Sequence, residues 1–170
     1  MSWSAPIAML LLLLSPGVSY AQEFRLSPEG FGPARVGMAL GEASKQLGVP
    51  LVKVQGTHQD ARYVVVPSRR YVGLSFTVSA TGIIDGVYVG YDSPRFKTDR
   101  NLHIGSSAND VWRAYGSQIE VKAYQCGSAF LIYTYRSPRD PSSGVIYTVS
   151  DSGLVEGVMA GTISTVSPPC

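Results

Sequence analysis

The sequence predicts an α+β fold made of two tandem repeats, each packing a short helix, or a helical pair, on an antiparallel sheet of three or four strands. Two ordered internal matches and a change of hydrophobic period within each repeat, from helical to alternating, predict this fold. We expect the strands of both repeats to join into one continuous curved sheet.

The first 21 residues are typical of a signal peptide. An apolar run from Ala8 to Leu14 precedes Pro16-Gly17, and small residues stand at Ser19 and Ala21, as signal peptidase requires. A buried strand or helix is the alternative for this stretch, which is far shorter than the ~20 apolar residues of a membrane-spanning helix. No cysteine lies near the cleavage site, so we expect no lipid anchor and a periplasmic or secreted mature chain.

The two internal matches define the organisation of the mature chain. Gly73–Gly90 matches Gly144–Gly161 without a gap, and Val36–Gly48 matches Ile104–Gly116. The distance along the chain between matched residues is three residues shorter in the second match than in the first. The additional residues fit between Arg136 and Ser143. The expected organisation is repeat 1 over residues 22–90, a linker over 91–100 and repeat 2 over 101–170.

Each repeat begins with a segment of helical periodicity. The apolar residues that recur at helical spacing are Leu40, Ala43 and Leu47 in the first repeat and Ala108, Val111, Trp112 and Tyr115 in the second. Gly48 and Gly116 follow as residues that can end a helix in a left-handed conformation. Ser107 and Asp110 have the spacing of a capping box, whereas Ala39 predicts a weaker start for the first helix.

After each helix the apolar period changes to two, which predicts strands. The alternating residues are Leu74, Phe76 and Val78 in repeat 1 and Val145, Tyr147 and Val149 in repeat 2. Gly82 and Gly153 are expected at positive φ in the intervening turns. Arg62–Val66 and Phe130–Tyr135 predict further strands.

The first helix segment resembles a known family. Val36-Gly37-Met38, Glu42 and Leu47-Gly48-Val49-Pro50 resemble the helix signature of the small outer-membrane assembly lipoproteins. The tandem arrangement is similar to that of the beta-lactamase inhibitor protein, whose two helix-plus-sheet repeats form one curved sheet. The resemblance implies this fold and, more weakly, a binding role. The acylated cysteine of the lipoproteins is missing, and fold alone carries no site residues.

Cys126 and Cys170 are the two cysteines of the chain. In an oxidising compartment they predict one disulfide that ties the C-terminal tail to repeat 2. Two free thiols, or a bridge from Cys170 to another chain, are the alternatives.

The sequence argues against enzymatic, metal-dependent and nucleic-acid functions. The net charge of +2 is too small for a nucleic-acid-binding face. His58 has no second ligand pair for a metal, and His103 has no adjacent serine or cysteine nucleophile. The glycines mark turns rather than a phosphate-binding loop. We therefore expect a protein that is not an enzyme and has no cofactor.

Tyrosines on the predicted strands are the candidate binding residues. Tyr88, Tyr133 and Tyr135 fall on strands, and Arg69 stands in a loop before Tyr71. Tyrosine supplies rigid, amphipathic contact area, although strands favour tyrosine in their cores as well. We expect an exported binding module that contacts a protein partner through the open face of its sheet. A small-ligand or cell-wall-glycan binder that uses the cleft between the repeats is the alternative.

Overall fold

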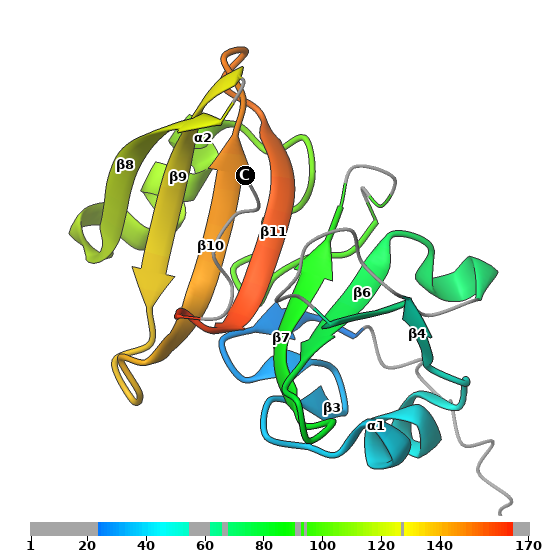
Figure 1. Ribbon diagram of the computed structural model, residues 1–170. Coiled ribbons are helices and arrows are strands. Elements are labelled where there is room, and N and C mark those ends of the chain that lie inside the picture. The colour runs from blue at the N-terminus through cyan, green and yellow to red at the C-terminus, as the bar shows by residue number, and fades with distance from the viewer. Residues whose placement is uncertain are drawn as a thin grey trace, which may run out of the picture.

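The structure is a computed structural model that describes residues 24–54, 62–65, 68–90, 93, 95–126 and 128–164 (Figure 1). The predicted signal peptide, residues 1–21, and His58 lie outside these residues. The helical elements are α1 (Leu40–Leu47), η1 (Arg69–Tyr71), α2 (Ala108–Tyr115) and η2 (Gly116–Gln118). The strands are β1 (Leu26–Ser27), β2 (Gly30–Phe31), β3 (Ala34–Arg35), β4 (Val52–Val54), β5 (Arg62–Val65), β6 (Leu74–Val78), β7 (Ile84–Val89), β8 (Ile119–Cys126), β9 (Ser128–Arg136), β10 (Ser143–Val149) and β11 (Val155–Thr162).

One eight-stranded antiparallel sheet contains the strands of both repeats, as the sequence predicts. Its order is β4-β5-β6-β7-β11-β10-β9-β8, so the last strands of the two repeats are neighbours at the centre. The four strands of repeat 1, β4 to β7, occupy one half of the sheet in chain order. The four strands of repeat 2, β8 to β11, occupy the other half in the reverse order. This order is the one that a two-fold axis through the sheet generates.

The register at the central joint confirms the duplication. Tyr88 of β7 pairs with Met159 of β11, and these two residues are equivalent in the Gly73–Gly90 and Gly144–Gly161 match. On either side, Val87 pairs with Ala160 and Val89 with Val158, which are again exchanged by the repeat. The pseudo-two-fold axis therefore passes through the Tyr88–Met159 pair.

The two helices are attached to their hairpins by the same bonds. The Gly37 amide donates to the Ile84 carbonyl at 2.8 Å, and the equivalent Gly105 amide donates to the Val155 carbonyl at 2.8 Å. A β-bulge interrupts the register after Thr77 in one hairpin and after Thr148 in the other, at equivalent positions. The duplication therefore extends from the chain path to individual hydrogen bonds.

The predicted helix ends and turns are confirmed. Gly48 ends α1 in the left-handed region at φ 68°, and Gly82 and Gly153 both have φ 78° in their turns. Ser107 and Asp110 form a full capping box at the start of α2, whereas Ala39 makes no side-chain cap on α1. Because glycine adopts positive φ without the steric cost of a Cβ atom, these positions define where each element stops.

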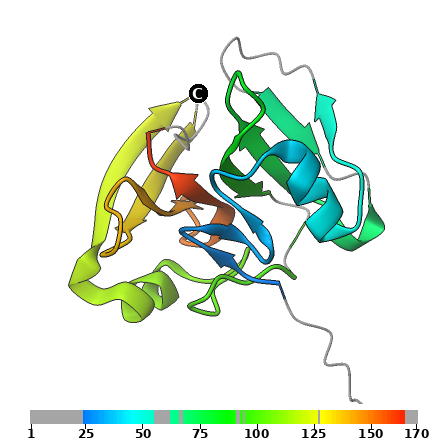
Figure 2. The same ribbon diagram turned by 90° about the horizontal axis from the view of Figure 1, so that it is seen from below.

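A second, three-stranded sheet was not predicted. It contains β1, β2 and β3, each two residues long, in chain order. Seen from below, these N-terminal strands lie between the two halves of the molecule (Figure 2), where β1 contacts β11 and β2 contacts β7. The expectation of a single sheet is therefore incomplete, because the N-terminal segment folds across the central joint as a separate layer.

Both helices and the N-terminal sheet cover the same face of the large sheet, which we call the helix side. One buried cluster joins Phe31 of β2, Ala43 of α1 and Val111 of α2 to inward residues of the large sheet, such as Val87 and Tyr147. The opposite face, which we call the open face, carries the alternate residues of the same strands.

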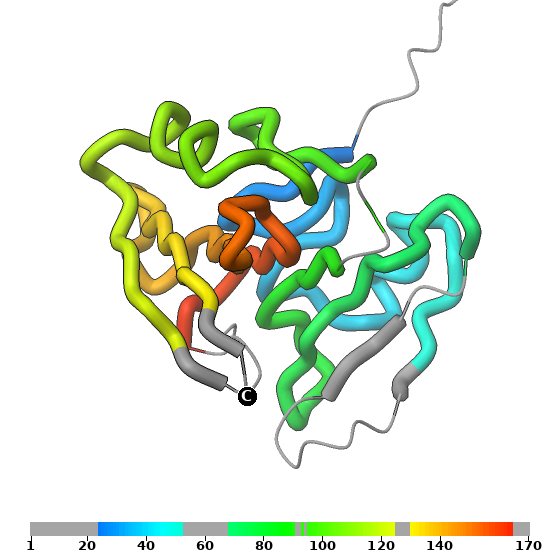
Figure 3. Tube along the Cα trace, turned by 90° about the horizontal axis from the view of Figure 1, so that it is seen from above, coloured from blue at the N-terminus to red at the C-terminus, as the bar shows by residue number. Residues whose placement is uncertain are grey.

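The segment predicted as a linker packs against the N-terminal sheet. The Leu26 amide donates to the Lys97 carbonyl at 2.9 Å, and the Asp99 amide donates to the Leu26 carbonyl at 2.8 Å. Figure 3 shows this stretch beside the N-terminal strands as it leads toward α2. Phe96 and Thr98 are buried there. Within the described residues 95–100, the connection between the repeats is therefore part of the core.

Candidate functional site

Tyr133 and Tyr135 do not form an exposed binding face. Their side chains are only 9% and 7% exposed and belong to the core on the helix side. The Tyr135 ring lies 4.4 Å from the ring of Tyr115 on α2, centroid to centroid. The strand prediction for this segment is right, but the expected exposure is wrong, because odd-numbered residues of β9 point toward the helices.

Tyr88 and Arg69 lie on different parts of the molecule. Tyr88 is on the open face and partly buried, and its ring packs over Gly90 and Gly157, where no Cβ atom intervenes. Arg69 begins η1, whose Tyr71 packs into the helix-side core. The Arg69 side chain is exposed. The structure therefore does not bring the four predicted partner-binding residues into one site.

His103 lies outside any arrangement typical of a catalytic site. Its Nδ1 atom is 2.7 Å from the Ile104 carbonyl, and its backbone amide donates to Ser106 Oγ at 3.0 Å. Within the described ranges, no three acidic, histidine or cysteine side chains group as metal ligands do. In the same ranges, no helix has both the length and the apolar character to cross a bilayer.

The predicted disulfide stays a prediction. Cys126 is the last residue of β8, but its side chain and Cys170 both lie outside what the structure describes.

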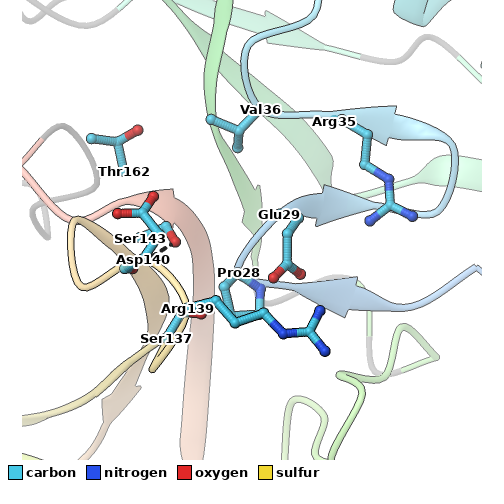
Figure 4. Close-up of a pocket in the computed structure, with 9 residues that line it drawn as sticks. All are labelled: Pro28, Glu29, Arg35, Val36, Ser137, Arg139, Asp140, Ser143 and Thr162. Atoms are coloured by element: carbon cyan, nitrogen blue, oxygen red, sulfur yellow. Dashed lines mark hydrogen bonds between the residues drawn. The ribbon is translucent and has the colours of Figure 1, made fainter.

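A pocket of about 490 Å³ lies where the N-terminal sheet meets repeat 2 (Figure 4). It is open to solvent, and seven of its nine lining residues are polar or charged. The lining residues are Pro28, Glu29, Arg35 and Val36 from the N-terminal segment, Ser137, Arg139, Asp140 and Ser143 from the β9–β10 connection, and Thr162 from the end of β11. Both predicted repeats therefore contribute to its wall.

Hydrogen bonds hold the wall of the pocket on the repeat 2 side. The Ser137 amide donates to the Ser143 carbonyl at 2.9 Å, and the Ser143 amide donates to the Asp140 carbonyl at 2.9 Å. Asp140 Oδ1 accepts from the Ser142 amide at 3.0 Å and from Ser142 Oγ at 2.6 Å. The Ser142 bonds lower the pKa of Asp140 and keep it ionised. Arg139 is thus an exposed cation on a fixed loop.

Backbone geometry holds the opposite wall. Glu29 lies in the turn between β1 and β2, and its carbonyl accepts from the Val36 amide at 2.9 Å. Gly30 has φ 134°, and a Cβ atom there would collide with the Ala34 carbonyl oxygen. Because only glycine fits this crossing, Glu29 and Arg35 are brought side by side at the end of the β2–β3 pair.

The charges in the pocket are balanced and available. Arg35, Arg139 and Glu29 are all exposed, and none of them forms an ion pair with another described residue. Two guanidinium groups can each hold a carboxylate with two parallel hydrogen bonds. Glu29 can receive an ammonium or an amide. The arrangement suits a polar ligand with groups of both signs.

Comparison with known proteins gives one structural likeness. No family model matches the chain, and no curated protein matches its sequence. The crystal structure of YjgB, a DUF4309 family protein from Bacillus subtilis, is similar with a TM-score of 0.50 at 12% identity, over 73% of this chain and 78% of that one. At this identity the likeness concerns the fold alone.

Sequence reasoning missed the pocket residues, although one signal was present. The three additional residues of repeat 2 fit in the loop between Arg136 and Ser143, and this loop forms one wall of the pocket. An insertion that breaks a repeat often carries function, because the repeated scaffold does not need it. The other wall had no such signal, since strands of two residues leave no periodic pattern.

Proposed function

We propose that the chain is an exported binding module, not an enzyme, that holds a charged peptide segment of a partner protein in the pocket between the N-terminal sheet and the β9–β10 loop. The observation that carries the proposal is the pair Arg35 and Arg139, exposed on two walls contributed by different repeats. Without a rigid joint between the repeats, this pair would have no fixed spacing.

The shape of the pocket favours a protruding peptide over a small molecule. Small-molecule sites enclose most of their ligand and are lined mainly by apolar and aromatic side chains. This pocket has no aromatic residue in its lining and is open to solvent. An exposed segment that presents a carboxylate to the arginines and an ammonium or amide to Glu29 satisfies its charges without needing enclosure.

A small polar ligand is the second candidate, because the volume of about 490 Å³ is in the range of such sites. Native mass spectrometry of protein purified from its own compartment distinguishes the two. A bound small molecule that is lost on exchanging Arg35 and Arg139 for glutamate supports this second candidate.

Charge reversal tests the proposed peptide site. We expect Arg35→Glu with Arg139→Glu to abolish capture of the partner from the native envelope or medium, because it turns both cations into repelling anions. The matched control is Arg113→Glu with Lys122→Glu, which makes the same change in net charge at side chains that are 71% exposed on α2 and β8.

The readout is quantitative mass spectrometry of captured proteins, followed by calorimetry with the purified partner at two ionic strengths. Affinity for the wild-type chain should fall as salt rises, since exposed charges are screened. Equal capture by the two double variants contradicts the proposal. Circular dichroism confirms that both variants remain folded.

A further inference from the structure

A long strand edge lies at one side of the large sheet. β8 is the last strand in the sheet order and, among the described strands, pairs only with β9. It lies at the outer margin of the sheet (Figure 1). β8 has eight residues, whereas β4 at the opposite edge has three. Such an edge presents a row of backbone donors and acceptors with which a strand of another chain can pair.

Two hydrogen bonds show which backbone groups of β8 point outward. The Ser137 amide donates to the Ser143 carbonyl, so the odd-numbered residues of β9 bond to β10 and the even-numbered ones bond to β8. Because β8 and β9 pair odd with odd, the backbone groups of odd-numbered residues in β8 face away from the sheet. The Ile119 amide agrees with this, since it donates to the Gly116 carbonyl of η2. The outward residues include Ile119, Val121 and Ala123.

The side chains along this edge are exposed and differ between the two faces. Glu120 and Lys122 lie on the open face, where their charged atoms are 2.7 Å apart. On the helix side, Val121 and Leu131 are each 39% exposed, and the exposed Ala123 pairs with Leu131. An edge that combines outward backbone groups with exposed apolar side chains favours association with another strand.

We propose that two copies of this chain pair through β8 in an antiparallel, two-fold symmetric dimer, with Val121 of one copy opposite Val121 of the other. The joint makes the two large sheets continuous. Each Val121 amide donates to the Val121 carbonyl of the other copy, and each Ala123 amide donates to the Ile119 carbonyl of the other copy. The Ile119 amide needs no new partner, because the Gly116 carbonyl already accepts from it.

Charge selects this register. With Val121 on the symmetry axis, Glu120 of each copy faces Lys122 of the other, so both cross-strand pairs join opposite charges. An axis through Glu120 or through Lys122 would place two like charges directly opposite each other, which is destabilising. An axis further along the strand in either direction leaves both side chains without an opposite charge across the joint. The register centred on Val121 is therefore the self-complementary one.

The apolar side chains and the closure of the assembly fit the same register. On the helix side, Val121 meets its own copy and Ala123 meets Ile119, so the exposed apolar surface of the edge is covered. Each copy has one β8 edge, and the two-fold axis uses both of them. Assembly through this edge therefore stops at two copies.

The proposal goes beyond the peptide site proposed above and does not depend on it. The pocket is lined by the N-terminal segment, the β9–β10 connection and the end of β11, none of which the joint uses. Arg113→Glu with Lys122→Glu should therefore weaken the dimer and still capture the partner that carries the peptide. Arg35→Glu with Arg139→Glu should lose the partner and keep the dimer.

Charge reversal tests the register. Sedimentation velocity follows the full mature chain over a wide range of concentration, with and without a reductant, and wild type should dimerise in both. Glu120→Lys and Lys122→Glu should each weaken the dimer at least roughly tenfold, because each places like charges in both cross-strand pairs. Lys45→Glu, exposed on α1 in repeat 1, makes the same charge change as Lys122→Glu and should leave the dimer unchanged.

Complementation separates this register from a general effect of charge. A chain that carries both Glu120→Lys and Lys122→Glu should dimerise as wild type does, because both pairs are opposite again. A mixture of the two single variants should form a mixed dimer for the same reason. Val121→Pro should abolish dimerisation but keep the fold, as checked by circular dichroism, because proline at an edge removes only a donor that points away from the sheet.

Hydrogen exchange measured by NMR locates the joint. The Val121 and Ala123 amides should exchange at least roughly tenfold more slowly in the concentrated dimer than in the dilute monomer, since the joint buries them in hydrogen bonds. The Lys122 amide points toward β9 and is the internal control, whose rate should stay the same.

Four outcomes overturn the proposal. A wild-type chain that is monomeric at every concentration removes the dimer. A dimer that the reductant dissociates is a disulfide between chains. Single variants that dimerise as tightly as wild type, or a double variant that stays monomeric, show that the joint lies elsewhere or in another register. Protection of the Val121 amide that requires a purified partner protein shows that β8 pairs with a strand of that partner instead.

Discussion

Tyr115 and Tyr147 form a buried hydroxyl pair between α2 and β10. Their oxygens are 2.8 Å apart, and both side chains are buried. Burial raises the pKa of Tyr147 to about 12 and also raises the pKa of Tyr115 above its usual range. The two hydroxyls form a hydrogen bond with each other. The pair therefore holds α2 on the sheet only while both tyrosines are protonated.

This pair predicts a loss of stability at alkaline pH. In the unfolded chain both tyrosines ionise near pH 10, whereas the folded chain keeps their protons, so the unfolding free energy falls as pH rises from about 10 toward 12. Replacing both by phenylalanine should cost little at neutral pH and make the alkaline decline shallower. Tyr147→Phe alone should destabilise by about 1–3 kcal/mol, since the Tyr115 hydroxyl stays buried without its partner.

Urea unfolding at a series of pH values measures both effects. Trp112 lies on α2 and reports the transition by fluorescence. An alkaline slope that is identical for wild type and the double variant contradicts the assignment of the pH dependence to this pair.

At the scale of elements, the two helices differ in how their N-termini are capped. Ser107 accepts from the Asp110 amide at 3.1 Å and Asp110 accepts from the Ser107 amide at 3.0 Å, while Ala39 in the equivalent position caps nothing. Glu42 already stands three residues after Ala39, where a capping box places its acidic partner. The first helix therefore lacks one hydroxyl for a complete box.

Exchanging the caps should change stability in opposite directions. Ala39→Ser should stabilise the chain by about 0.5–1 kcal/mol, because the exposed N-cap position has room for the hydroxyl and Glu42 can reciprocate. Ser107→Ala should destabilise it by about 1 kcal/mol. Thermal and urea unfolding measure both, and Ala39→Ser combined with Glu42→Ala isolates the reciprocal bond. A neutral Ala39→Ser would show that the first helix start is held by its hairpin instead.

The strands show how far the sequence predicts this fold. The alternation of apolar and polar residues and the paired glycines predict both central hairpins, because the same pattern occurs in both repeats. In β9, however, Phe130–Tyr135 is apolar or aromatic at nearly every position. Such a strand has no polar face, so its pattern cannot say which residues face the helices. For this reason the sequence predicts exposure for Tyr133 and Tyr135, although both side chains are buried on the helix side.

The candidate site depends on contacts that no local pattern encodes. β1–β3 are held by long-range bonds, such as that from the Leu26 amide to the Lys97 carbonyl. Glu29 and Arg35 line the same pocket as Arg139 only because the N-terminal layer folds over the central joint. Because these contacts join segments far apart in the chain, the sequence indicates a cleft between the repeats but not the residues that line it.

At the scale of the whole molecule, the halves share one sheet and one core. Val87 of β7 and Val158 of β11 are equivalent in the repeat and are 0% and 2% exposed at the joint. The β2 residue Phe31 joins the same cluster and packs edge-to-face on Phe96, 5.2 Å away between ring centroids. Because this largest buried cluster spans both halves, the molecule should unfold as one unit.

Cavity variants at the joint test this coupling. Val87→Ala lies in the first half, whereas Trp112 is the single tryptophan of the predicted mature chain and reports on the second. We expect Val87→Ala and Val158→Ala each to destabilise by about 2 kcal/mol, from two lost methyl groups and the cavity they leave. The Trp112 fluorescence transition and the far-ultraviolet dichroism transition should shift together, and Val72→Ala, at a side chain 45% exposed, should shift neither. If Val87→Ala moves the dichroism transition but leaves that of Trp112 in place, the halves unfold independently, and a binding pocket that spans them has no rigid frame.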